Sequence, residues 1–280
     1  MVLFEDSAFP ISVYGIIIAV AILAAFVTVI LLFRYLGWRD DLPYLILLLA
    51  VPCGIVGARI FYVFFSDWSM YQSFFDVINL RRGGLAIYGA VIGGAAGLYA
   101  VCRWKKVGFM ALADVIVIGL IFAQGIGRWG NFVNNEAYGF AVDNHVPPFT
   151  VLIYGTPHLA TFFYESIMNF IGFGVMLFLF LYLRKTGKYK TGTILAVYLI
   201  WYGVTRAIIE PLRTDSLLII GSANEFILNR VSFVLSLAII IAGVVLLYIA
   251  RTKSLFMEEK CLITTKTDTS EGSSPNSTQS

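Results

Sequence analysis

The chain has 280 residues, of which 59% are apolar and only 13% are charged, and its formal net charge is +3. Its mean hydropathy is +0.83. Soluble domains carry about 25% charged residues, so this composition excludes an ordinary water-soluble enzyme and indicates an integral membrane protein. We expect membrane lipid around the chain and no nucleic-acid partner.

The cysteines and histidines do not suggest a metal or disulfide site. Cys53 and Cys102 lie in apolar segments, Cys261 lies in a polar tail, and none is part of a CxxC pair. His145 and His158 lie apart and lack HExxH spacing. We therefore expect no disulfide framework, no catalytic metal and no cofactor.

Apolar stretches long enough to cross a bilayer recur along the chain. A transmembrane helix needs about 20 apolar residues. Met1–Pro10 contains Glu5 and Asp6 but no Lys or Arg, so it lacks the basic start of a cleaved signal peptide, and the first stretch is expected to stay in the protein. The predicted spans are 11–33, 44–66, 85–102, 110–127, 166–183, 193–210 and 229–250. The predicted fold is an all-α bundle of about seven transmembrane helices.

The basic residues predict the orientation of these spans. Thirteen Lys and Arg residues cluster after the first, third, fifth and seventh spans. The other connections and their flanks hold only six arginines: Arg81, Arg82, Arg128, Arg206, Arg213 and Arg230. Because positive charge is retained on the cytoplasmic side, the N-terminus is expected outside and the C-terminus in the cytoplasm. This is a multi-pass topology in a cytoplasmic, or inner, membrane.

Composition also predicts the division of the chain. Residues 1–255 form the predicted transmembrane domain, and within it 131–165 is long and polar enough for a small extracytoplasmic cap. Residues 256–280 are rich in Ser and Thr and are predicted to be a disordered cytoplasmic tail. No internal repeat stands out, which argues weakly against a transporter made of duplicated halves.

The third span begins with a glycine-rich run around Tyr88. Gly89, Gly93 and Gly97 have the small-xxx-small spacing that lets two helix backbones approach closely, so a packing role is the simplest interpretation. The Tyr88 hydroxyl needs a partner if it is buried. Tyr88 is therefore either an interfacial aromatic anchor or part of a site.

The most specific run is Gly125–Gly139, at the end of the fourth span. It places Arg128 and Asn131 on one helical face, followed by Asn134, Glu136 and Gly139. A guanidinium and amides that point the same way suit a phosphate. A polar loop that only ends a helix is the alternative, but polar groups at membrane depth are costly and default to function.

The sixth predicted span carries a second polar stripe. Tyr202, Arg206 and Glu210 are spaced i, i+4 and i+8, while Pro211 makes the helical phase of Glu210 uncertain. Arg206 needs an anionic ligand or a counter-charge, so a purely structural Arg206–Glu210 pair remains open. Arg59 and Asp114, in other spans, could pair with each other.

The run GRWGNFVNNEAYG at 127–139 resembles the signature of the prolipoprotein diacylglyceryl transferase family. GGLAIYGAVIGG around Tyr88, TFFYES at 161–166, the stripe at 202–210 and the early Tyr14-Gly15 pair agree in order, so the resemblance covers about residues 10–250. It implies a seven-helix fold with a site toward the outer leaflet. It also implies phosphatidylglycerol as donor and the lipobox cysteine of a prolipoprotein signal peptide as acceptor.

The resemblance also implies the site residues. The expected catalytic residues are Arg128, Arg206, Tyr88, Glu136 and Glu210. The expected substrate-binding residues are Asn131, Gly139, Tyr14, Tyr202 and Asn134. Many members of the family have histidine where this chain has Tyr88, which leaves the general base open.

The expected reaction is a displacement at the glycerol carbon that bears the phosphoester. The cysteine thiolate forms a thioether, glycerol phosphate leaves, and the two arginines stabilise its charge by bidentate hydrogen bonds. Glu136 or Glu210 accepts the thiol proton, or both only hold the arginines in place. A lipid carrier and a membrane scaffold with a structural polar cluster are the alternatives from other classes.

Overall fold

The computed structural model describes residues 2–3, 11–67, 71, 73–79, 83–214 and 231–252. The chain forms two compact units, which we describe separately. Among the described residues, unit 1 contains 2–3, 11–29, 109–214 and 231–252, and unit 2 contains 30–67, 71, 73–79 and 83–108. Arg81, Arg82, Arg230 and the predicted tail lie outside the described residues, as do the last basic residues of the orientation argument.

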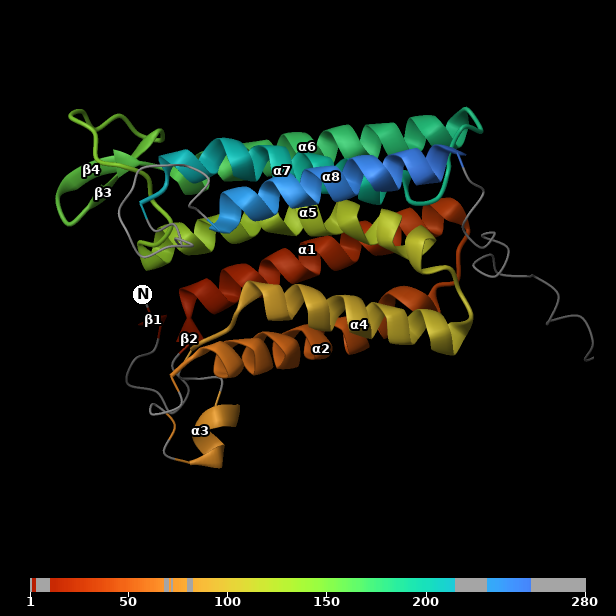
Figure 1. Cartoon of the computed structure of the whole chain (residues 1–280), viewed down its shortest axis with the longest axis horizontal. Coiled ribbons are helices and arrows are strands. Elements are labelled where there is room, and N and C mark those ends of the chain that lie inside the picture. The colour runs from red at the N-terminus through yellow and green to blue at the C-terminus, as the bar shows by residue number, and fades with distance from the viewer. Residues whose placement is uncertain are drawn as a thin grey trace, which may run out of the picture. The chain divides into compact units, whose positions relative to one another are not determined.

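Unit 1 consists of long helices with two small hairpins (Figure 1). Its helices are α1 (Val13–Leu36, which continues into unit 2), α5 (Phe109–Asn134), α6 (Thr161–Lys185), α7 (Thr193–Ile209), η3 (Glu210–Leu212) and α8 (Val231–Thr252). Its strands are β1 (Val2–Leu3), β2 (Ile11–Ser12), β3 (Thr150–Ile153) and β4 (Thr156–Leu159). Each hairpin is antiparallel, with Val2 opposite Ser12 and Thr150 opposite Leu159.

Small residues let the unit 1 helices pack closely. A Cβ added to Gly119 of α5 would lie 2.8 Å from the Ala25 carbonyl oxygen of α1, and one added to Gly203 of α7 would lie 2.8 Å from the Ser236 carbonyl oxygen of α8. Larger residues at these positions would push the helix backbones apart. The rotation and depth of each helix are therefore set by a few close contacts.

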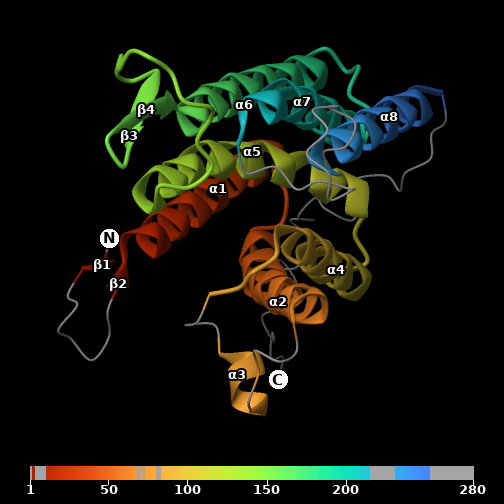
Figure 2. The same ribbon diagram turned by 60° about the vertical axis from the view of Figure 1, so that its left-hand side comes forward.

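Unit 2 is built on the pair α2 (Asp41–Phe65) and α4 (Ile87–Lys105), with the short helix α3 (Phe74–Ile78) in the connection between them. Figure 2 shows α2 and α4 side by side. A Cβ on Gly89 would meet the backbone of Gly57, and one on Gly97 would lie 2.8 Å from Ala50 Cα. The predicted packing role of the glycines in the third span is confirmed.

Each of the seven predicted spans corresponds to a long helix. In the described part of the chain, six helices are long and apolar enough to cross a membrane: α1, α2, α5, α6, α7 with its 3-10 extension, and α8. Helix α4 corresponds to the third predicted span, 85–102, and is not among these six helices; it is 19 residues long and rich in glycine. The integral membrane character is confirmed, whereas a seventh crossing by α4 stays a prediction.

The predicted ends of two spans were wrong. Helix α5 continues beyond residue 127 to Asn134, and α6 begins at Thr161 rather than 166. Backbone hydrogen bonds carry the helices through polar residues because those side chains have partners in neighbouring elements. The segment predicted as the cap, 131–165, therefore includes two helix ends, and the connection itself holds the β3–β4 hairpin.

The suggested Arg59–Asp114 pair is also wrong, because each side chain has other partners. The Arg59 guanidinium, in unit 2, donates to the carbonyls of Val77 (2.7 Å), Asp76 (2.8 Å) and Gly83 (2.6 Å). Asp114, in unit 1, accepts from Tyr189 Oη and from backbone amides at the start of α7. Both residues hold connections between helices in place.

Candidate functional site

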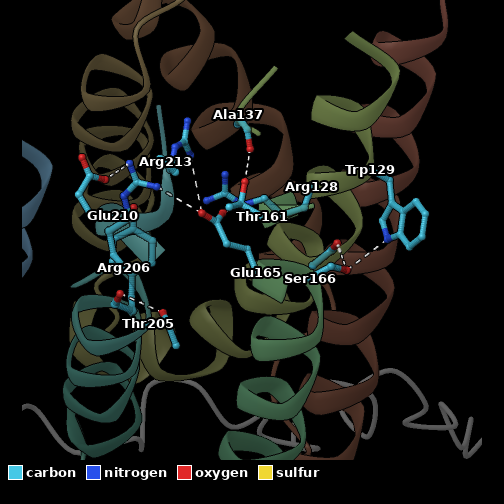
Figure 3. Close-up of polar contacts among 12 residues, drawn as sticks. Arg128, Trp129, Ala137, Thr161, Glu165, Ser166, Thr205, Arg206, Glu210 and Arg213 are labelled. Carbon is cyan, nitrogen blue, oxygen red and sulfur yellow. Dashed lines mark hydrogen bonds and ion pairs between the residues drawn. The ribbon is translucent and has the colours of Figure 1, made fainter. Parts of the chain in front are cut away.

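Three ion pairs of unit 1 converge on Glu165, in the second turn of α6. Arg128 of α5 contacts Oε2 of Glu165 through Nε. Arg206 of α7 reaches Oε1 at 3.3 Å, and Arg213, which follows η3, lies 3.7 Å from the same oxygen. Figure 3 shows these three arginines around the carboxylate, which is 7% exposed. We call Arg128, Glu165, Arg206, Glu210 and Arg213 the arginine cluster.

A second carboxylate, Glu210, completes the arginine cluster. Arg206 Nη2 lies 2.7 Å from Glu210 Oε2, and the Glu210 side chain is fully buried. Helix α7 ends at Ile209, and Pro211 lies within the 3-10 turn that follows. The predicted i, i+4 neighbourhood of Arg206 and Glu210 is confirmed, and Arg206 bridges both carboxylates.

The net charge of the arginine cluster favours an anion. Three guanidinium groups face two carboxylates, so the five side chains of the cluster together carry a net charge of +1. Each guanidinium carries five N–H donors, more than these two carboxylates can accept. The arginines are 11–24% exposed, so part of this donor capacity stays accessible. An incoming phosphate group can use it.

Neutral hydrogen bonds hold α5 and α6 in the register that brings Arg128 to Glu165. Trp129 Nε1 donates to Ser166 Oγ at 3.2 Å, and Ser166 Oγ donates to the Gly125 carbonyl at 2.8 Å. Figure 3 shows Trp129 and Ser166 beside the cluster. A Cβ on Gly125 would lie 2.7 Å from the Phe170 ring, so glycine at this position leaves room for that ring against α5.

The segment after α5 is held against the ends of α6 and η3 by Gly139. Gly139 N donates to the Leu159 carbonyl (2.8 Å), and Phe140 N donates to the Leu212 carbonyl (3.1 Å). Gly139 also forms an isolated β-bridge with Arg213. A Cβ on Gly139 would lie 2.8 Å from both Leu159 Cβ and the Leu212 carbonyl oxygen. Gly139 therefore positions the backbone that carries Arg213, and this contact gives its place in the predicted site a physical reason.

Three other residues of the signature run lie around the end of α5. Asn131 is partly exposed, three residues after Arg128, on the last turns of the helix. Asn134 ends α5, and its Nδ2 donates to Glu136 Oε1 at 3.3 Å. Glu136 is exposed. The printed contacts of Glu136 do not involve the arginine cluster, so a proton-accepting role for it stays a prediction.

Two of the predicted tyrosines lie on unit 1 helices that line the site. A Cβ on Gly130 would lie 2.8 Å from the Tyr14 ring, so the start of α1 packs against α5 two residues after Arg128. Tyr202 lies one turn before Arg206 on α7, and its ring stacks on Tyr198 with centroids 6.1 Å apart. Both positions suit contacts to a ligand held by the arginines.

Tyr88 belongs to unit 2, in the first turn of α4. Its side chain is 36% exposed, and its ring centroid lies 6.1 Å from that of Phe61 on α2. Both interpretations of Tyr88, an interfacial anchor and a site residue, stay predictions.

The sequence interpretation missed the residue at the centre of the site. Glu165 was expected at the end of the polar connection and received no role, and Arg213 was counted only for topology. The signal was the TFFYES run, which places one carboxylate at the start of an otherwise apolar span. A lone carboxylate at membrane depth needs a cation or several hydrogen-bond donors. The choice among several arginines required the structure.

The described residues contain no group of three or more His, Cys, Asp or Glu side chains placed to hold a metal ion. The candidate site is therefore described by its ion pairs and the backbone contacts around them.

Comparisons with known proteins agree on one family. The family model described as prolipoprotein diacylglyceryl transferase matches residues 1–249. The chain is 41% identical over 212 residues to a Streptococcus uberis protein, covering 73% of this chain and 77% of the relative. It is 38% identical over 234 residues to one from Finegoldia magna, covering 83% and 88%. A Streptococcus pyogenes serotype M1 relative is 41% identical over 215 residues, covering 75% and 79%. All three relatives are named phosphatidylglycerol–prolipoprotein diacylglyceryl transferase.

Proposed function

The chain belongs to the prolipoprotein diacylglyceryl transferase family, and from this premise we propose that it transfers the diacylglyceryl group of phosphatidylglycerol to a cysteine thiol of prolipoproteins. This is the first step of bacterial lipoprotein maturation. The single observation that carries the proposal for this chain is the arginine cluster, whose surplus positive charge lies at one end of membrane-spanning helices.

The charge of the donor lipid matches the arginine cluster. The phosphodiester of phosphatidylglycerol carries one negative charge, and the five side chains of the arginine cluster carry a net charge of +1. Guanidinium groups bind phosphate oxygens in a bidentate manner, which an ammonium group cannot do. Arg128 and Arg206 come from facing helices, so together they hold the phosphate between α5 and α7.

The reaction breaks one C–O bond and forms one C–S bond. The cysteine thiolate attacks the glycerol carbon that carries the phosphoester, and the phosphate leaves as glycerol phosphate. The leaving group gains negative charge in the transition state, and the arginines stabilise it there more than in the bound lipid. No bond to phosphorus is broken.

The thiol must lose its proton before or during the attack. A free cysteine thiol has a pKa of about 8.5, so only a few per cent of it is ionised near neutral pH, and nearby arginines raise that fraction. Glu210 and Glu136 are the carboxylates that we propose as acceptors of this proton. Glu165 is the positioning residue, because it holds three arginines in one place.

The remaining predicted residues have substrate-binding roles in this proposal. Asn131 and Asn134 bind oxygens of the lipid headgroup, Tyr14 and Tyr202 border the lipid, and Gly139 keeps the Arg213 backbone in place. The acceptor is a lipobox cysteine. The site faces the outer leaflet, with the N-terminus outside and the C-terminus in the cytoplasm.

The experiment is an assay with the full-length protein in detergent, phosphatidylglycerol and a lipobox peptide. We expect a diacylglyceryl mass gain on the peptide and an equal amount of released glycerol phosphate. A peptide with serine in place of cysteine is the matched control and should stay unmodified. An unmodified cysteine peptide, with the protein folded and the lipid bound, would instead indicate a lipid carrier.

A further inference from the structure

Gln124 places an amide inside the membrane-spanning part of α5. Its Nε2 lies 2.8 Å from the Tyr198 hydroxyl on α7 and donates to it. Its Oε1 is buried and has no hydrogen-bond partner among the residues that the structure describes. An unpaired polar atom is costly in an apolar environment, so such an atom calls for a further hydrogen-bond partner, which a bound ligand or a water can supply.

The Gln124–Tyr198 pair lies in line with the arginine cluster. Gln124 precedes Arg128 by four residues on α5, so the two side chains share a helical face and are about 6 Å apart along the axis. Tyr198, Tyr202 and Arg206 form the corresponding i, i+4, i+8 stripe on α7. Two facing polar stripes thus run from the arginines toward the middle of the membrane.

A phospholipid has its polar groups in a matching order. With the phosphate at Arg128 and Arg206, the next polar groups toward the acyl chains are the ester carbonyls on the neighbouring glycerol carbons. These carbonyls are acceptors and need a donor at that depth. The bonds between the phosphate and an ester carbonyl span a distance comparable with one helical turn.

We propose that Gln124 and Tyr198 form a subsite for an ester carbonyl of the diacylglyceryl group, an inference that rests on the proposed function. When the Gln124 amide turns over, the Tyr198 hydroxyl donates to Oε1, and Nε2 donates to the ester carbonyl. Every polar atom of the pair then has a partner. The subsite holds the glycerol unit in place while the adjacent C–O bond breaks.

The test compares diacyl phosphatidylglycerol with dialkyl phosphatidylglycerol, whose ether links lack carbonyls but whose headgroup and chains are the same. A single hydrogen bond corresponds to about a 3- to 10-fold change in kcat/KM. We expect the wild-type protein to prefer the diacyl lipid by at least this factor. Gln124→Leu should lower kcat/KM for the diacyl lipid by about that factor and leave it unchanged for the dialkyl lipid.

Two further variants provide an independent test and a control. Tyr198→Phe retains the ring and its packing, and it should reduce the ester preference in the same way even if Gln124→Leu folds poorly. Ser236→Ala on α8 removes a buried hydroxyl that bonds within its own helix, at 2.7 Å from the Ser232 carbonyl, and should keep the wild-type preference.

Equal losses on both lipids in Gln124→Leu and Tyr198→Phe would overturn the subsite and assign the pair to helix packing or to the peptide. A wild-type protein that forms no thioether from the diacyl lipid would instead overturn the proposed function, and the subsite with it. The two failures are distinguished by the wild-type reaction alone.

Discussion

Asp114 and Glu165 are both buried carboxylates of unit 1, but their partners differ in kind. Asp114 is 0% exposed and accepts hydrogen bonds from neutral donors: Tyr189 Oη at 2.6 Å, Gly192 N at 2.7 Å and Leu195 N at 2.7 Å. Glu165 is 6% exposed and faces guanidinium groups from α5, α7 and the segment after η3. Burial alone therefore does not distinguish a structural carboxylate from one in a functional site.

The two sites differ in the hydrogen-bonding capacity and charge that their donors can still offer to a ligand. The donors to Asp114 include two backbone amides that α7 leaves unpaired at its N-terminus, and each amide has one hydrogen to give. The positive end of the α7 dipole also favours the carboxylate. The arginines around Glu165 have further donors and charge to offer. Asp114 fixes the fold, whereas Glu165 organises cations that can bind a substrate.

The largest expected effect comes from the cations of the Glu165 site. Arg206→Ala should abolish diacylglyceryl transfer, by about 100-fold or more, because it removes a donor to the leaving phosphate. Arg206→Lys keeps the charge but loses bidentate geometry and should recover only part of the activity. The peptide mass assay measures both, with membrane insertion checked by extraction and size-exclusion chromatography. Full activity in Arg206→Ala would contradict the proposal that Arg206 binds the phosphate.

Neutralising the central carboxylate should have the next largest effect. Glu165→Gln is nearly isosteric, but it weakens the attraction that gathers Arg128, Arg206 and Arg213. We expect kcat to fall by about 10- to 100-fold, consistent with misplaced electrostatic groups. The protein should still be extracted as a monodisperse species. Unchanged kcat would show that the arginines keep their positions without Glu165.

Asp114→Asn is the matched change at the other carboxylate. Charged hydrogen bonds stabilise by about 1.5–3 kcal/mol each, so the variant should lose stability of about that size. A thermal-unfolding assay in detergent should show a lower Tm, while the activity of the remaining folded protein stays close to wild type. A kcat loss comparable with that of Glu165→Gln, at unchanged Tm, would contradict the distinction between the two sites.

Gly139→Val tests whether the Glu165 site also depends on the backbone that carries Arg213. The new side chain would enter the space of Leu159 Cβ and the Leu212 carbonyl, both 2.8 Å from the Cβ position. We expect kcat/KM to fall by about 10-fold as Arg213 moves away from Glu165. Gly155→Val, in the turn between β3 and β4, has no atom within 4 Å of its Cβ position but a φ of +85°, so it controls for strain elsewhere in the same connection.

The smallest effect is expected from the end of the chain. Deletion of the residues after Lys260 should change kcat/KM by less than about twofold, because the composition of this tail is typical of disorder and it contains no site residue. The same peptide assay measures it. A loss comparable with that of Gly139→Val would assign the tail a role that its sequence does not indicate.

The helices were predictable where apolar runs are long, and their ends were not. Residues 110–127 were recognised, but α5 continues through Arg128 and Asn131 to Asn134. A pattern based on hydropathy ends a span at its first polar residues. The backbone hydrogen bonds of the helix continue past that point when the polar side chains have partners on α6 and α7. Arg128, for example, forms an ion pair with Glu165 of α6.

The amino-acid sequence alone indicated that the chain lies in a membrane and that close glycine contacts pack its helices, and it predicted a functional role for Arg128 and Arg206. These features depend on composition and on spacing within one element. Only the tertiary structure decided that Glu165 joins the two arginines and that Asp114 and Arg59 serve their own local connections. Contacts between elements depend on the rotation and depth at which helices pack, and close backbone contacts such as that of Gly119 with Ala25 set these quantities.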